Sequence, residues 1–183
     1  MFGRRPDAQL VRDLPAIRRF MPFISPRRGE SVFYYPQDVD AEPALRFLEG
    51  LNANRPEKQP ITFFHLVLRA VIKQMHERPR INRFVAGGRI WQRDGIWMSF
   101  SAKKAFDDDS PVITVKQKME PEHSVVEMAD QIYEKLGAGR SGKKTTSDNE
   151  VDLLLRLPVP LVRMAMGLAH LADRFGLLPK AMI

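Results

Sequence analysis

Cysteine is absent from the 183-residue sequence. This absence excludes disulfide bonds, thiolate metal sites and a cysteine nucleophile, and it fits a reducing compartment, so we expect a cytoplasmic protein. Long hydrophobic runs are also missing, because charged side chains such as Arg163 and Asp173 interrupt the most apolar region, residues 153–183. We therefore expect no membrane-spanning helix there. We also expect no signal peptide at the basic start, where Asp7 breaks any apolar run.

Positive charge is what the chain has in excess: 29 Lys and Arg residues against 22 Asp and Glu residues, a net charge of +7. This bias favours anionic partners such as nucleic acid, acidic lipid or a phosphorylated cofactor, although a soluble surface explains it equally well. The apolar share of 44% and the charged share of 28% are ordinary for a globular domain. We predict one domain over residues 1–183, with an arm at 1–28 and an α/β body at 29–183.

Hydrophobic periodicity predicts an alternation of helices and strands. The expected helices span residues 16–21, 40–51, 62–77, 122–136, 151–158 and 161–175. The expected strands span residues 31–35, 84–92, 96–103 and 112–118. This order predicts an α/β (α+β) two-layer sandwich, with a mixed sheet and helices on one of its faces.

Two glycine-containing dipeptides bear on the sheet. Asp94-Gly95 stands between two strand-like runs and predicts a hairpin that pairs residues 84–92 with 96–103. Trp91 and Trp97 would then form an aromatic pair across the two strands. Gly87-Gly88 lies within the first run and not between a strand and a helix, so we do not interpret it as a phosphate-binding motif.

The helix at residues 62–77 is predicted to be mostly buried, with one narrow wet face. That face holds His65, Arg69, Lys73 and His76. It is either an anion-facing groove or a solvated helix face, and the second is the more usual case. The remaining histidines, His123 and His170, have no acid or hydroxyl partner placed by spacing, and Asp107 to Asp109 are typical of a solvated turn. Spacing alone predicts no metal site and no catalytic group.

A more specific signal comes from the order of motifs. The buried helix at 62–77 is followed by Pro79-Arg80-Ile81-Asn82 and a strand. This pattern resembles the catalytic domain of 2-oxoacid dehydrogenase complex acyltransferases (dihydrolipoyl acyltransferases), in the chloramphenicol acetyltransferase-like superfamily. Residues 88–100 continue like that family's hairpin, and residues 175–180 resemble bacterial stand-alone relatives. The resemblance covers nearly the whole chain from about Ile17 onward.

The resemblance implies the N-terminal part of a trimeric acyltransferase domain. That family transfers an acyl group between coenzyme A (CoA) and a thiol, hydroxyl or amine acceptor, and it uses no metal. Its general base is a histidine in H-x-x-x-D-G, a motif that lies late in the domain. This chain has no H-x-x-x-D-G: its only Asp-Gly is Asp94-Gly95, and Ile90 stands where the histidine would be. No catalytic residue is therefore assigned, and we expect the chain to be inactive unless a continuation past Ile183 or a second chain completes the fold.

Candidate CoA-channel residues follow from the resemblance. They are Tyr34 on the first predicted strand, Ser99 and Ser101 on the hairpin, and Lys103 and Lys104, which would meet the CoA phosphates. Lysines at a strand end are also commonly just solvated. Three functions stay open: an acyltransferase portion, a non-catalytic scaffold or assembly module of the same fold, and a basic binder of nucleic acid or acidic membrane through the loop at 140–144. The motif order favours the first and disfavours nucleic acid and membrane.

Overall fold

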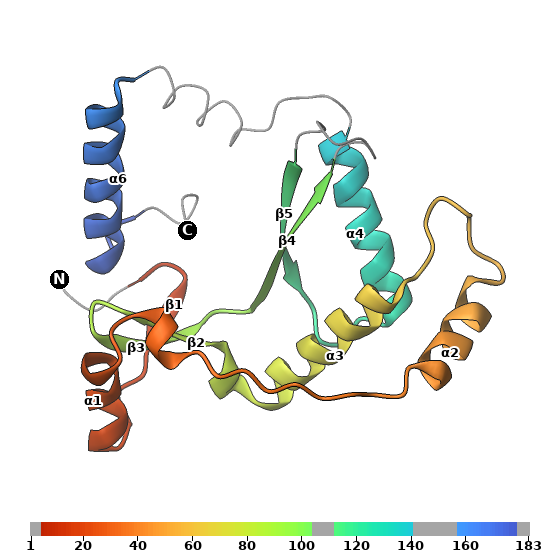
Figure 1. Cartoon of the computed structure of the whole chain (residues 1–183), viewed down its shortest axis with the longest axis horizontal. Coiled ribbons are helices and arrows are strands. Elements are labelled where there is room, and N and C mark those ends of the chain that lie inside the picture. The colour runs from red at the N-terminus through yellow and green to blue at the C-terminus, as the bar shows by residue number, and fades with distance from the viewer. Residues whose placement is uncertain (1–4, 104–111, 141–156, 179–183) are drawn as a thin grey trace. The chain divides into compact units, whose positions relative to one another are not determined.

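The computed structural model describes residues 5–103, 112–140 and 157–178, and Figure 1 traces their helices and strands. These residues form two compact units. Unit 1 contains residues 5–34, 79–94 and 157–178, and unit 2 contains residues 35–78, 95–103 and 112–140. The predicted α+β class is confirmed, but the described strands form two antiparallel sheets in place of one mixed sheet. Whether both units constitute the single predicted domain stays a prediction.

The sheet of unit 1 contains β1 (Ala8–Leu10), β2 (Arg83–Ala86) and β3 (Arg89–Arg93), in the order β1-β3-β2. Gly87 and Gly88 join β2 to β3 with φ angles of 58° and 71°. Two consecutive positive φ angles suit glycine and characterise the two-residue turn of a tight hairpin. The hairpin predicted at Asp94-Gly95 is therefore wrong. Asp94-Gly95 instead connects β3 to a strand of the other sheet. The Asp94 N–H still donates to the Asp7 carbonyl beside β1.

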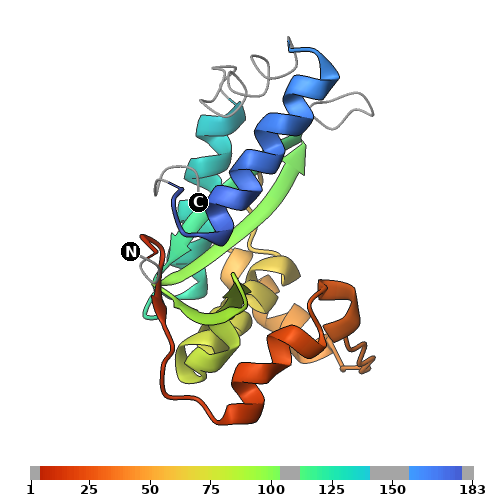
Figure 2. The same cartoon turned by 90° about the vertical axis from the view of Figure 1, so that its left-hand side faces the viewer.

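Two longer helices accompany this sheet: α1 (Ala16–Ile24) and α6 (Val159–Arg174). They lie on opposite sides of it (Figure 1 and Figure 2). The predicted end of α1 before Pro22 is wrong, since the helix includes Pro22 and ends at Ile24. A proline removes one N–H donor and crowds the carbonyl four residues earlier, but the Ser25 N–H still donates to the Met21 carbonyl, so helical bonding continues past Pro22. The predicted last helix is confirmed.

Gly176 ends α6 as predicted. Its φ angle is 68°, its N–H donates to the Asp173 carbonyl, and the Leu177 N–H donates to the Ala172 carbonyl. This pair of hydrogen bonds satisfies the last helical carbonyls and requires a left-handed residue, which glycine supplies without strain. The predicted helix at 151–158 lies mostly outside the described residues.

The strand predicted at residues 31–35 is wrong. Ser31 ends a short 3₁₀ helix, η1 (Arg28–Ser31), and the next residues have no regular structure. Phe33, Tyr34 and Tyr35 are all exposed. Aromatic residues favour a strand only where a neighbouring strand supplies packing and hydrogen bonds, and no described strand pairs with this stretch. A second 3₁₀ helix, η2 (Pro79–Asn82), leads into β2.

Unit 2 packs helices against one face of a two-stranded sheet. Its elements are α2 (Glu42–Asn52), α3 (Phe63–Glu77), β4 (Ile96–Lys103), β5 (Val112–Met119) and α4 (Val125–Arg140). The corresponding predicted elements are confirmed, with shifts of a few residues at their ends. One buried cluster contains Ile72, Ile96, Met119, Met128 and Ile132, and a second contains Leu48, Ile61 and Ala129. Within the described ranges, no helix is long and apolar enough to cross a membrane.

Helix α3 is less buried than predicted. Only His65 and Ile72 are buried, whereas Phe63, Phe64 and Val67 are exposed. His65, which was assigned to the wet face, is only 4% exposed. The rings of Phe64 and Tyr133 pack against its imidazole, with ring centres 5.5 Å and 5.6 Å away. Nδ1 of His65 also accepts a hydrogen bond from the Thr62 N–H at 3.0 Å, as part of a reciprocal cap at the helix start.

Candidate functional site

The structure groups three of the five predicted site residues. Ser99, Ser101 and Lys103 lie on β4, all exposed on the face of the sheet that points away from the core. Tyr34 belongs to unit 1, where its side chain is 86% exposed in a stretch without regular structure. Lys104 lies outside the described residues. The candidate site is therefore built around β4 and its partner β5.

Strict alternation along both strands creates the two faces of this sheet. Ile96, Met98, Phe100 and Ala102 point toward the core, as the sequence predicted, so the residues between them point outward. The register pairs Ser99 with Lys116 and Ser101 with Thr114, and it places Trp97 opposite Lys118. The outward side chains, which we call the outer face, are Trp97, Ser99, Ser101, Lys103, Val112, Thr114, Lys116 and Lys118.

The outer face is positively charged. It carries three lysines, and neither β4 nor β5 contains an acidic residue. Nζ of Lys116 lies 5.7 Å from the centre of the Trp97 ring, within range of a cation–π contact. Nζ of Lys118 lies 2.8 Å from Oε1 of Glu120, just beyond the end of β5, and this hydrogen bond lowers the pKa of Glu120. Ammonium groups beside hydroxyls suit an anion such as a phosphate.

The outer face has no histidine of its own. His65 and His76 lie in α3, His123 lies in the turn before α4, and His170 lies in α6. Burial, and then the charge of Arg55, lower the pKa of His65. Nδ1 of His123 lies 3.2 Å from the side-chain nitrogen of Gln131. General-base catalysis on the outer face would therefore need a group from elsewhere.

The cationic stripe predicted along α3 is not a continuous groove. His65 is capped and buried, and Nη2 of Arg69 donates to the Pro121 carbonyl at 2.8 Å. The predicted cross-strand pair of Trp91 and Trp97 is also wrong, because Trp91 lies opposite Phe84 in one sheet and Trp97 opposite Lys118 in the other. Among the described residues, no cluster of three or more potential ligands could hold a metal ion.

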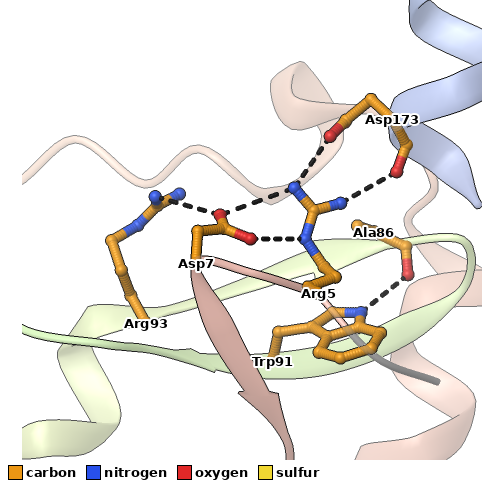
Figure 3. Close-up of polar contacts among 6 residues, drawn as sticks. All are labelled: Arg5, Asp7, Ala86, Trp91, Arg93 and Asp173. Atoms are coloured by element: carbon orange, nitrogen blue, oxygen red, sulfur yellow. Dashed lines mark hydrogen bonds and ion pairs between the residues drawn. The ribbon is translucent and has the colours of Figure 1, made fainter. Parts of the chain in front are cut away.

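A buried ionic network in unit 1 was not predicted (Figure 3). Nε of Arg5 donates to Asp7 at 3.0 Å, and Nη2 of Arg5 donates to Asp173 at 2.7 Å. The Arg5 side chain is only 4% exposed, and its guanidinium lies 5.2 Å from the centre of the Phe84 ring. Burial alone would lower the pKa of Arg5, but the hydrogen bonds and charges of Asp7 and Asp173 outweigh it and raise that pKa. The network ties the N-terminal segment to the end of α6.

Two groups of residues were not predicted as site residues, and only the first group shows a signal in the sequence. Lys116 and Lys118 occupy the polar positions of an alternating strand, so the pattern of residues 112–118 already placed them on one face. The Arg5–Asp173 pair joins residues 168 positions apart, and no periodicity marks such a contact.

No family model, no curated protein and no solved structure matches this chain.

Proposed function

We propose that this chain is part of a CoA-dependent acyltransferase domain with a chloramphenicol acetyltransferase-like fold, and that its outer face binds the phosphates of CoA. The observation that carries the proposal is the grouping of Lys103, Lys116 and Lys118 with serine hydroxyls on one face of two strands that contain no Asp or Glu. The motif order over residues 62–86, a helix followed by Pro79-Arg80-Ile81-Asn82 and a strand, supports acyl transfer as the reaction. The acceptor is a thiol, hydroxyl or amine.

Each type of side chain on the outer face has a role in this proposal. The lysine ammonium groups contact phosphate oxygens as point charges. Ser99 and Ser101 donate hydrogen bonds to the same groups, and the half-exposed Trp97 ring supplies a flat surface for the adenine. The chain by itself binds CoA but does not transfer the acyl group, because none of its histidines stands in H-x-x-x-D-G.

Titration calorimetry with CoA tests the binding step. The double variant Lys116→Gln/Lys118→Gln removes two charges from the outer face and should weaken CoA binding about tenfold, since each exposed charge contact contributes up to about 1 kcal/mol. Lys135→Gln is the matched control, because Lys135 is an exposed lysine on α4. Equal affinities for the wild type and the double variant would refute the proposed CoA face.

Turnover of acetyl-CoA tests the reaction class. The protein expressed from its full reading frame should release CoA from acetyl-CoA in the presence of a suitable thiol, hydroxyl or amine acceptor. Absence of turnover with all three acceptor classes, despite CoA binding, would leave the fold proposal but remove the acyltransferase activity.

The exposed apolar side of α3 favours a second candidate, a non-catalytic assembly module that forms a homo-oligomer, a trimer by family resemblance. Phe63, Phe64, Val67 and Val71 are all exposed. Contiguous exposed apolar side chains characterise interaction surfaces. Light scattering should detect an oligomer that Val67→Asp/Val71→Asp dissociates and that Val39→Asp, at an exposed position outside the helices, does not. A monomeric wild type would rule this candidate out.

A further inference from the structure

A cavity of about 460 Å³ lies within unit 1, away from the outer face of β4 and β5. It is bounded by the chain before α1, by the first turn of α1, and by one face of the β2–β3 hairpin. Register explains that face: Arg83 pairs with Gln92 and Val85 with Ile90, so these four side chains lie on the same side of the hairpin. The volume lies in the range of small-molecule sites.

Three arginines from three separate segments line this cavity. Arg18 comes from α1, Arg80 from η2 and Arg83 from β2, and Asp13 is the only acidic residue in the lining. Among the described residues, Arg18 and Arg80 form no ion pair with a carboxylate, so the cavity has an excess of positive charge. Guanidinium groups present several N–H donors in a plane and suit oxyanions.

Arg83 is held in place before any ligand binds. Its Nε donates to Oε1 of Gln92 at 3.0 Å, and Nε2 of Gln92 donates to the Pro79 carbonyl at 2.9 Å. This chain of hydrogen bonds fixes one edge of the Arg83 guanidinium. Its two Nη groups have no acceptor among the described residues. A positioned donor loses little entropy when an anion binds.

The start of α1 adds a second attraction for anions. Pro15 is the N-cap residue, it forms no side-chain cap, and the first turn contains no acidic residue. The first bonded amides of the helix are those of Arg18 and Arg19, which both donate to the Pro15 carbonyl. Uncapped N–H groups and the helix dipole favour a negative charge at this end, and Leu14, Pro15 and Arg18 border the cavity.

The remaining lining is apolar and includes Leu14, Val85 and Ile90. A bare inorganic ion would leave this surface unused, whereas an organic group attached to the anion would cover it. Three guanidinium groups also exceed what a carboxylate needs, because one arginine already satisfies both carboxylate oxygens. The geometry points to a site for the phosphate ester of a small apolar organic molecule. This site is independent of the proposed CoA face, because all its residues belong to unit 1.

Calorimetric titration with three matched probes tests the site: phenyl phosphate, inorganic phosphate and benzoate. Phenyl phosphate should bind most tightly, because it alone offers both a phosphate and an apolar ring. Benzoate binding as tight as that of phenyl phosphate would overturn the phosphate preference. Inorganic phosphate binding as tightly would show a free-anion site and overturn the organic part of the proposal.

Substitutions of the lining arginines test whether they bind phenyl phosphate. Arg18→Gln and Arg80→Gln should each weaken phenyl phosphate binding about tenfold, the effect of one lost charge-assisted hydrogen bond. Arg19→Gln is the matched control, since Arg19 is the next residue of α1, is also exposed and is not among the residues that line the cavity. An equal loss in Arg19→Gln, or no loss in the other two, would overturn the site. Circular dichroism checks that each variant remains folded.

Discussion

Unit 1 and unit 2 use different interactions to hold their elements together. In unit 2, fully buried side chains such as Ile72, Ile132 and Met119 join two helices to a sheet. In unit 1, neither α1 nor α6 contains a buried residue, and the buried described apolar residues are Ala8 and Trp91. Instead, the Arg5 guanidinium of the N-terminal segment binds the Asp7 carboxylate beside it and the Asp173 carboxylate of α6 (Figure 3). One chain thus combines a hydrophobic core with a small ionic and aromatic one.

The difference has consequences for stability and for binding. Apolar burial contributes about 25 cal/mol per Å², is non-directional and is not screened by salt as an ion pair is, so unit 2 has the more robust interior. The energy of an ion pair depends on its geometry, and removal of one partner leaves the other charge without compensation. Unit 1 also leaves the apolar sides of both its helices exposed, including Phe20, Ile24 and Leu168. Unit 1 is therefore the unit with more surface for partners and less core of its own.

Among the tests of this difference between the two units, truncation of a buried isoleucine should change the free energy of unfolding most. Ile132→Ala in α4 should lower the free energy of unfolding by about 2–5 kcal/mol, because it leaves a cavity in the core of unit 2. Ile17→Ala in α1 is the same chemical change at an exposed position and should alter it by less than about 0.5 kcal/mol. Denaturant titration measures both values. Similar losses in both variants would contradict the comparison.

Removal of the buried guanidinium should have the next largest effect. Arg5→Met leaves Asp7, whose side chain is 10% exposed, without its closest cation, and should cost about 2–3 kcal/mol. Hydrogen exchange should become faster in β1 and at the end of α6 but not in α4. Arg46→Met is the control, because its pair with Glu42 is exposed and should contribute less than about 0.5 kcal/mol. An unchanged exchange rate in β1 would show that the network does not hold unit 1.

A pH dependence confined to unit 2 should be the smallest of these effects. The pKa of His65 is below its ordinary value of 6.5 in the folded state, so the unfolded chain binds the proton more readily. The contribution of His65 is therefore fully present above about pH 6.5. It is lost as the pH falls through 6.5 toward the lower pKa of the folded state.

His65→Gln isolates this contribution. Glutamine at this third helical position can still accept the hydrogen bond from the Thr62 N–H, so the cap is kept while the titrating group is removed. Unfolding free energies measured between about pH 7.5 and about pH 5.5 should fall more steeply for the wild type than for the variant. Parallel pH profiles would show that His65 does not titrate in this range.

Local signals predicted many elements of unit 2 correctly. The alternation of residues 96–103 and 112–118 predicted both strands and the inward side chains, and Pro43 was correctly predicted in the first turn of α2, although Ala41 and not Asp40 is the N-cap residue. The Asp40 carboxylate does accept a hydrogen bond from the Glu42 N–H at 3.0 Å. These features depend on residues that are close together in the sequence, and periodicity and capping patterns are made by such residues.

Pairings between strands were harder to predict. Gly87-Gly88 and Asp94-Gly95 are both turn signals, and the choice between them depends on which strands find partners. The same difficulty explains the wrong strand at residues 31–35 and the misplaced Trp91–Trp97 pair. For the candidate site, Ser99, Ser101 and Lys103 were predicted together, whereas Tyr34 was placed on a strand that does not form.

The sequence by itself determined the α+β class, the absence of cysteine chemistry, the positive charge and the two faces of β4 and β5. These properties follow from composition and from short-range periodicity. Tertiary structure alone decided that β3 and β4 belong to different sheets, that Arg5 reaches Asp173, and that Arg18, Arg80 and Arg83 line one cavity. Those outcomes depend on contacts between residues distant in the chain, and no local pattern encodes which distant side chains meet.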